Sequence, residues 1–150
     1  MHFLVFLIAS AAAGASGIFF QPGAWYAGLT KPGFTPPNWA FPVVWTTLYV
    51  LIAWAAARLA AVPGSGLVLA LWAAQIALNT LWTPVFFGAH RMGAGMAILA
   101  LLWVVVAVLT VLAFRLDRWA GALLLPYLAW LSVAAALNFS LWQNNPGAGV

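Results

Sequence analysis

The chain has 150 residues, of which 67% are hydrophobic and only 4% are charged, and its mean hydropathy is +1.07. A soluble domain of this size needs far more polar surface, so the composition predicts an integral membrane protein. The net charge of +4 comes from basic residues scattered between apolar runs, which disfavours nucleic-acid binding. The absence of cysteine excludes disulfides, thiolate nucleophiles and metal sites with sulfur ligands.

Five apolar runs are each long enough to cross a bilayer with some tilt. They occupy residues 3–20, 41–62, 67–87, 92–114 and 119–142. Open strands cannot satisfy their backbone in lipid, so we predict an all-α membrane protein, a five transmembrane helix bundle that forms one domain over residues 1–150. The first run also resembles the apolar region of a secretory signal, but the basic residues that precede such a region are missing, which favours a retained helix.

The basic residues at the ends of the runs predict the orientation. Arg58, Arg115 and Arg118 lie on the side of the N-terminus, whereas Lys31 and Arg91 lie on the other side. Three against two favours a cytoplasmic N-terminus. Which cellular membrane holds the protein is not specified by this pattern.

The longest connection, residues 21–40, contains four of the nine prolines together with Trp25, Tyr26 and Trp39. Proline disfavours helix at its own position and at the preceding residue, so this segment is expected to follow a stiff, extended path. It is either a lid over a pocket or a connector whose aromatic rings lie at the membrane interface.

Small residues recur at four-residue spacing in the first three runs, a pattern that permits close packing of helices in lipid. The stripes are Ala9, Ala13 and Gly17 in the first run, Ala53, Ala57 and Ala61 in the second, and Ala70 with Ala74 and Ala73 with Ala77 in the third. Each stripe packs against a neighbouring helix of the same chain or against a second subunit. We expect the first arrangement.

Side-chain amides within the predicted spans must face the bundle interior, because lipid offers them no hydrogen-bond partner. Gln75, Asn79 and Trp82 share one helical face of the third run. Tyr127, Trp130, Ala134 and Asn138 share a face of the last run. Because successive runs cross the membrane in opposite directions, the ends of the third and last runs and the start of the second run lie on the same side. Residues 21–40 lie on that side too.

Six residues are therefore expected to meet at that end: Trp45, Tyr49, Asn79, Trp82, Trp130 and Asn138. They form either an aromatic cavity for a flat, largely apolar ligand or a set of hydrogen bonds that joins helices. Physical chemistry alone favours neither interpretation. Pro84 and Pro126 are expected to kink their helices, which would widen a cavity or simply shape the bundle.

The chain is poor in groups for acid–base or metal chemistry. Asp117 is the only carboxylate side chain, which excludes paired-carboxylate catalysis. His2 and His90 lie at opposite predicted faces, which argues against a two-histidine metal site within one chain. No ionisable residue lies near the centre of a span, so proton-driven transport is disfavoured. We predict no catalytic residue, no metal ligand and no required cofactor.

Three ordered blocks resemble the TspO/MBR family, the translocator or tryptophan-rich sensory proteins. The first block runs from Trp25 to Tyr49 and contains WYAGLTKP, PPNW, FP and WTTLY; the second is Gln75 to Gly88, and the third is PYLAW followed by Leu137-Asn138. Together they cover nearly the whole chain. Phe34 stands where the family commonly has tryptophan. Near the end of the last run, Phe139 and Gln143 replace the tyrosine and the basic residue of the animal cholesterol pattern. Cholesterol binding in that mode is therefore not supported.

The resemblance implies a five-helix fold, usually a homodimer, that binds tetrapyrroles such as protoporphyrin IX or haem. Residues that match the family's ligand pocket are Tyr26, Trp45, Asn79, Trp82, Ala129 and Trp130. Tyr49 and Asn138 complete the expected site. The predicted function is a membrane receptor, sensor or carrier for tetrapyrroles and other flat hydrophobic ligands. The alternatives are light- and oxygen-dependent porphyrin degradation by the pocket tryptophans, or a structural and regulatory membrane partner.

Overall fold

The computed structural model describes residues 2–19 and 23–148, and its regular elements within those ranges are all helical. They are α1 (His2–Phe19), α2 (Ala24–Ala27), α3 (Ala40–Ala60), α4 (Gly66–Thr83), the π-helical turn η1 (Pro84–Gly88), α5 (Met92–Leu116) and α6 (Arg118–Asn144). Residues 20, 21 and 22, where the first predicted run ends and the long connection begins, lie outside the described residues. The ends of the other four runs lie within two residues of their predicted positions, the usual uncertainty of helix boundaries.

Four of the described helical stretches are long and apolar enough to cross a membrane. These are α3, α4 continued by η1, α5 and α6. In α1 the stretch His2–Ser16 is apolar but shorter than the roughly 20 residues of a full crossing. The protein is therefore an integral, multi-pass membrane protein, with four long spans and one shorter apolar helix beside them.

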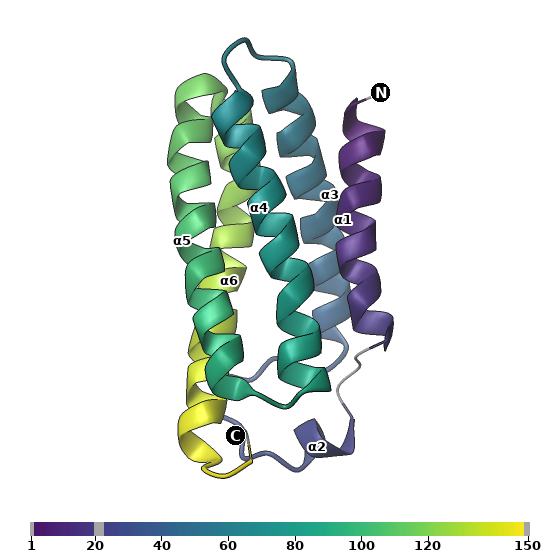
Figure 1. Ribbon diagram of the computed structural model, residues 1–150, viewed down its shortest axis with the longest axis vertical. Coiled ribbons are helices and arrows are strands. Elements are labelled where there is room, and N and C mark those ends of the chain that lie inside the picture. Colours follow the sequence, from purple (N-terminus) through teal and green to yellow (C-terminus); the bar gives the residue numbers. More distant parts are fainter. Residues whose placement is uncertain (1, 20–22, 149–150) are drawn as a thin grey trace.

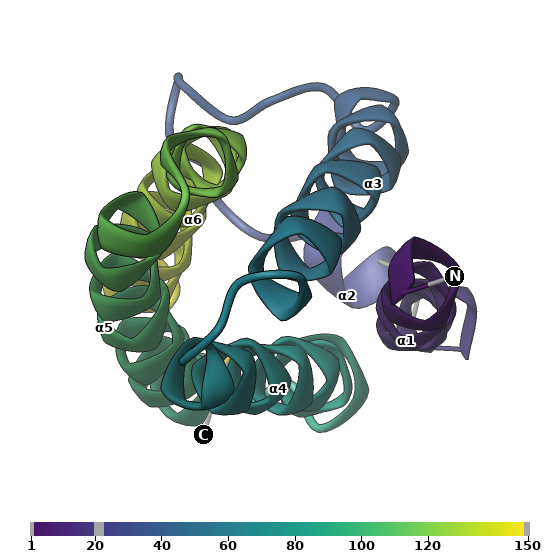
Figure 2. The ribbon, with the colours of Figure 1, turned by 90° about the horizontal axis from the view of Figure 1, so that it is seen from above.

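The five longest helices form a closed ring in the spatial order α1, α3, α6, α5 and α4, seen end-on in Figure 2. α5 and α6 pack along each other as an antiparallel pair, and α1 closes the ring by packing against both α3 and α4. The N-terminus lies at one end of the bundle, whereas α2 and the C-terminus lie together at the other end (Figure 1). The connection between α1 and α3 therefore lies beside the C-terminal segment.

The exterior of this bundle differs from that of a soluble protein, although its core is likewise mostly apolar. Large apolar side chains such as Ile8 and Val104 are exposed on the outside, whereas the amides of Gln75, Asn79 and Asn138 are buried. Lipid solvates the apolar surface and offers no hydrogen bonds to an amide, so the amides turn inward as the sequence predicts.

Two prolines occur within the long helical stretches. Pro84 begins η1, in which the Ala89 amide donates to the Pro84 carbonyl across five residues (2.8 Å), so the helix widens into a π-turn where the proline ring enters it. Pro126 lies inside α6, which continues beyond it to Asn144. Neighbouring helices support α6 on both sides, which allows a proline within a span.

The connection between α1 and α3 differs from the predicted continuous extended path. α2 forms one helical turn, in which the Ala27 amide donates to the Gly23 carbonyl and the Gly28 amide to the Ala24 carbonyl, both at 3.0 Å. No proline occurs between Ala24 and Gly28, so every amide needed for these bonds is present. The prediction of a continuous extended path was wrong at this turn.

The small-residue stripes divide into two groups. Ala13 and Ala53 are buried, as expected for stripes that pack within the chain. Four alanines of the α4 stripe are exposed: Ala70, Ala73, Ala74 and Ala77. The expectation that a helix of the same chain covers this last stripe was wrong, because α5 and α1 pack against other faces of α4.

Candidate ligand-binding site

A chain of hydrogen bonds crosses the interior of the ring and joins α3, α4 and α6. The Tyr49 hydroxyl donates to Asn79 Oδ1 (3.0 Å), and Asn79 Nδ2 donates to the Tyr127 oxygen (3.0 Å). The Tyr127 hydroxyl in turn donates to Gln75 Oε1 (2.6 Å). Buried polar groups in a low-dielectric interior stabilise the fold only when they are paired, and this chain pairs groups from three helices. We call it the interior hydrogen-bond chain.

A second polar contact lies nearer the end of the bundle that carries α2. Trp82 Nε1 donates to Asn138 Oδ1 (3.0 Å), and Asn138 Nδ2 donates to the Met92 carbonyl (3.0 Å). The contact joins α4, α6 and the start of α5. Gly95 permits it: a Cβ there would lie 3.3 Å from Asn138 Oδ1 and 3.4 Å from Trp82 Nε1, tighter than ordinary packing.

Aromatic rings surround the α3 end of the interior chain. Trp45 stacks on Tyr49 with ring centroids 5.5 Å apart, and its edges meet Tyr127 at 6.3 Å and Trp130 at 6.4 Å. Phe41 makes an edge-to-face contact with Trp130, with ring centroids 5.8 Å apart. Offset-stacked and edge-to-face pairs of this kind fix ring orientation and leave flat apolar faces available for contact.

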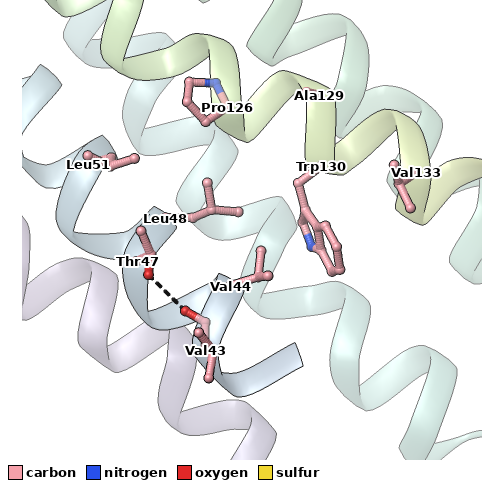
Figure 3. A pocket seen from close by; sticks show the side chains of 9 residues that line it. All are labelled: Val43, Val44, Thr47, Leu48, Leu51, Pro126, Ala129, Trp130 and Val133. Atoms are coloured by element: carbon pink, nitrogen blue, oxygen red, sulfur yellow. Dashed lines mark hydrogen bonds between the residues drawn. The ribbon is translucent and has the colours of Figure 1, made fainter. Parts of the chain in front are cut away.

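A groove of about 460 Å³ opens on the outer surface between α3 and α6. Its walls are Val43, Val44, Thr47, Leu48 and Leu51 from α3 and Pro126, Ala129, Trp130 and Val133 from α6 (Figure 3). The Thr47 hydroxyl donates to the Val43 carbonyl within its own helix (2.9 Å), so the α3 wall is apolar in effect. Trp130 belongs both to this groove and to the aromatic cluster around Trp45, and it connects the two.

Three buried polar atoms have no hydrogen-bond partner among the described residues: the Tyr26 hydroxyl, Gln75 Nε2 and Trp130 Nε1. An unpaired buried donor carries most of its desolvation cost, on the order of 1–3 kcal/mol, so such atoms often mark the place of a missing partner. Burial also raises the pKa of the Tyr26 hydroxyl, which therefore stays neutral. All three groups are thus able to donate to an acceptor supplied from outside the chain.

The segment that contains α2 is attached to the C-terminal segment by side-chain hydrogen bonds. The Thr30 amide donates to Asn145 Oδ1 (2.7 Å), and Asn145 Nδ2 donates back to the Thr30 carbonyl (2.9 Å). Trp25 Nε1 donates to the Ala148 carbonyl (3.0 Å), while the Trp25 ring stacks on His90 at 4.2 Å. The segment therefore has a defined position across one end of the bundle. We call residues 23–40 the lid segment.

The eight residues predicted for the site fall into three groups. Trp45, Tyr49, Asn79 and Trp130 meet in and around the interior chain. Trp82 and Asn138 bond to each other, and Phe87 links them to Tyr26 through edge contacts at 5.6 Å on both sides. Ala129 is exposed and lines the outer groove. Asn79 faces the interior, and of the eight only Ala129 and Trp130 line that groove.

Three contributors to this region were not among the predicted site residues. Gln75 and Tyr127 complete the interior chain, and their helical spacing from Asn79 and Trp130 already placed them on the correct faces. The Met92 carbonyl is a backbone acceptor at the start of α5, for which the sequence carries no signal. The described residues contain no group of three or more side chains able to hold a metal ion.

These features define a class of protein: a multi-pass membrane bundle with an apolar exterior, an interior joined by amide and hydroxyl side chains, and an apolar groove that contains one tryptophan. Comparison with known families agrees with this class. The sequence model of the TspO/MBR family matches residues 3–143. The chain belongs to the TspO/MBR family.

Relatives in bacteria and animals show how far the similarity extends. Protein CrtK of Rhodobacter capsulatus is 51% identical over 97% of this chain and 93% of its own length. The tryptophan-rich sensory protein of Cereibacter sphaeroides is 48% identical over 95% of this chain and 90% of its own. The human translocator protein is 39% identical over 82% of this chain and 76% of its own.

Proposed function

We propose that this protein is a membrane receptor or carrier for a flat, largely apolar tetrapyrrole such as protoporphyrin IX or haem. The ligand would lie against Trp130 and the aromatic cluster behind it. The observation that carries the proposal is the buried Trp130 indole N–H, which has no acceptor among the residues that the structure describes and lies beside a groove of about 460 Å³. Pockets that hold drug-sized ligands have roughly 300–1,000 Å³, mostly apolar walls and a few polar groups, as here.

Each predicted residue has a role in this proposal. Trp45 and Trp130 supply flat walls for stacking, and the exposed Cβ of Ala129 leaves room above the groove floor. Asn79 uses one amide hydrogen and one oxygen lone pair in the interior chain. One further hydrogen and one further lone pair therefore remain for a ligand that enters past Trp45.

Of the remaining four residues, Tyr26, Trp82 and Asn138 belong to the lid end of the bundle in this proposal, and Tyr49 belongs to the interior hydrogen-bond chain. Tyr49 positions Asn79 through its hydroxyl. Trp82 and Asn138 hold α4 against α6, and the unpaired Tyr26 hydroxyl contributes a donor beneath the lid segment. Ligand entry would then involve the lid segment, whose fixed position depends on the Thr30–Asn145 and Trp25–Ala148 contacts.

We further propose that the whole chain is one domain with five crossings, and that α1 is the fifth. α1 packs against both α3 and α4, and Figures 1 and 2 show it alongside α3. Its side chains Leu4, Val5 and Ile8 are 59–61% exposed, the arrangement expected where a helix faces acyl chains. Tilt and snorkelling allow a short apolar helix to span.

We also propose a homodimer that packs through the exposed alanine stripe of α4. Small side chains let two backbones approach closely in lipid, where hydrophobic driving force between helices is absent. Changing Ala74→Leu should reduce cross-linked dimer in native membranes. Ala100→Leu, at an exposed alanine of α5, is the matched control and should leave the dimer unchanged.

The binding proposal is tested by titrating the purified protein with protoporphyrin IX and following the porphyrin absorbance. Trp130→Phe keeps a six-membered aromatic ring and removes the pyrrole part of the indole with its N–H, and the loss of that hydrogen bond should weaken binding about fivefold. Trp119→Phe makes the same chemical change at an exposed position at the opposite end and should leave binding unchanged.

Asn79→Leu should also weaken binding, because it removes the amide from the wall behind Trp45. Unchanged affinity in both Trp130→Phe and Asn79→Leu would refute this site. Mass spectrometry of the bound porphyrin after illumination separates the binder, which returns its ligand intact, from a degrading enzyme.

A further inference from the structure

A second groove, of about 370 Å³, lies between α1 and α3 near the end of the bundle opposite the lid segment. Phe3 of α1 and Trp54, Ala57 and Arg58 of α3 line it. Phe3 is 37% exposed and Trp54 is 50% exposed, so the groove opens toward the surrounding membrane. It shares no residue with the groove at Trp130.

Arg58 places a cation at the edge of this apolar groove. Its Nε donates to Asp117 Oδ2 (2.8 Å) and its Nη2 to Asp117 Oδ1 (3.2 Å). Within the described residues no acceptor is recorded for Nη1, and the Arg58 side chain is 38% exposed. Guanidinium has donors on several edges, so the ion pair with Asp117 leaves one edge available to a second anion.

The surroundings of the ion pair carry excess positive charge. Arg115 and Arg118 are both exposed and lie two residues before and one residue after Asp117 in the chain. Asp117 is the only acidic side chain of the protein. The exposed indole of Trp119 lies in the same region, and interfacial tryptophan marks the depth of the lipid headgroups.

We propose that this groove binds an anionic phospholipid. The phosphate would contact the free edge of the Arg58 guanidinium, and one acyl chain would lie along Phe3, Trp54 and Ala57. Guanidinium pairs well with phosphate, and the apolar side chains of Phe3, Trp54 and Ala57 offer contact to an acyl chain. Arg115 and Arg118 favour a headgroup with net negative charge over a zwitterionic headgroup, which brings a cation of its own.

The test uses the full chain in a nonionic detergent, titrated with phosphatidylglycerol or phosphatidylcholine of identical acyl chains. Native mass spectrometry counts the bound lipid. The double variant Arg58→Gln, Asp117→Asn removes one positive and one negative charge, so it leaves the local net charge unchanged and no buried charge unpaired. We expect its preference for phosphatidylglycerol to fall about fivefold, the typical net contribution of one hydrogen-bonded contact.

Arg91→Gln is the matched control, because it removes an exposed arginine at the opposite end of the bundle. It should keep the full preference. An equal fall in Arg91→Gln, or an unchanged preference in the double variant, would overturn the proposal, because either result indicates general surface electrostatics.

Two further arms test the lipid as the source of the phosphate. Ala57→Phe fills the groove and keeps every charge, so it should weaken binding of phosphatidylglycerol while the protein remains helical. Millimolar inorganic phosphate should fail to displace the lipid. Displacement by phosphate, or normal lipid binding by Ala57→Phe, would show that the apolar groove takes no part.

Discussion

Replacing Tyr127 with phenylalanine tests the interior hydrogen-bond chain with the smallest possible change. The variant loses only the hydroxyl, which accepts from Asn79 Nδ2 and donates to Gln75 Oε1. Tyr127 is fully buried, so water does not replace the lost partner. Interhelical hydrogen bonds in membranes average about 0.6 kcal/mol and reach about 1.7 kcal/mol, so two such bonds predict a loss of about 1–3 kcal/mol in unfolding free energy.

The measurement is unfolding in mixed micelles of increasing SDS content, followed by far-ultraviolet circular dichroism. Tyr49→Phe is the comparison, because it removes a single bond, to Asn79 Oδ1, and should lose only about 0.6 kcal/mol. In a Gln75→Leu background the effect of Tyr127→Phe should shrink by about the value of one bond, since its acceptor is already gone. Equal stability of Tyr127→Phe and the unmodified protein would refute the chain as a source of stability.

Three other outcomes follow from contacts between elements. Gly95→Val should push Trp82 away from Asn138 and lower the SDS midpoint of unfolding in the same assay. A midpoint equal to that of the unmodified protein would contradict the close packing at Gly95. Asn145→Ala should release Thr30 and speed porphyrin association in stopped flow, and an unchanged rate would show that the lid segment is not held by these bonds. The hydrogen bond from Arg58 holds the pKa of the Asp117 carboxyl below its ordinary value. The ion pair therefore stabilises the fold above about pH 4. This stabilisation disappears as the pH falls through the lowered pKa and the carboxylate is protonated. Thermal unfolding below about pH 4 should show that loss, and Asp117→Asn should abolish the pH dependence.

The Arg58–Asp117 pair shows why some contacts are not predictable from the sequence. The two residues are 59 positions apart, and each alone is typical of an interfacial charge. The sequence placed both on the N-terminal side of the membrane. Their contact depends on how far α3 extends beside the turn between α5 and α6, which packing decides.

The amides illustrate what can be predicted and what cannot. Gln75, Asn79 and Asn138 had to turn inward because lipid cannot bond them, and helical periodicity identified their faces. Which partner each would find depends on the rotation of every helix about its axis. Asn79 bonds Tyr49 and Tyr127, whereas Asn138 bonds Trp82 and a backbone carbonyl, a division that the sequence left open.

The sequence by itself determined the membrane environment, the long spans, the inward direction of the amides and the family, because these depend on composition, on periodicity and on ordered motifs along one chain. Only the tertiary structure decided the ring order, the groove between α3 and α6 and the contact of Thr30 with Asn145, 115 residues away. In lipid, apolar side chains gain little by choosing one neighbour over another. Close fit and a few polar pairs therefore select the arrangement, and both are properties of the assembled bundle.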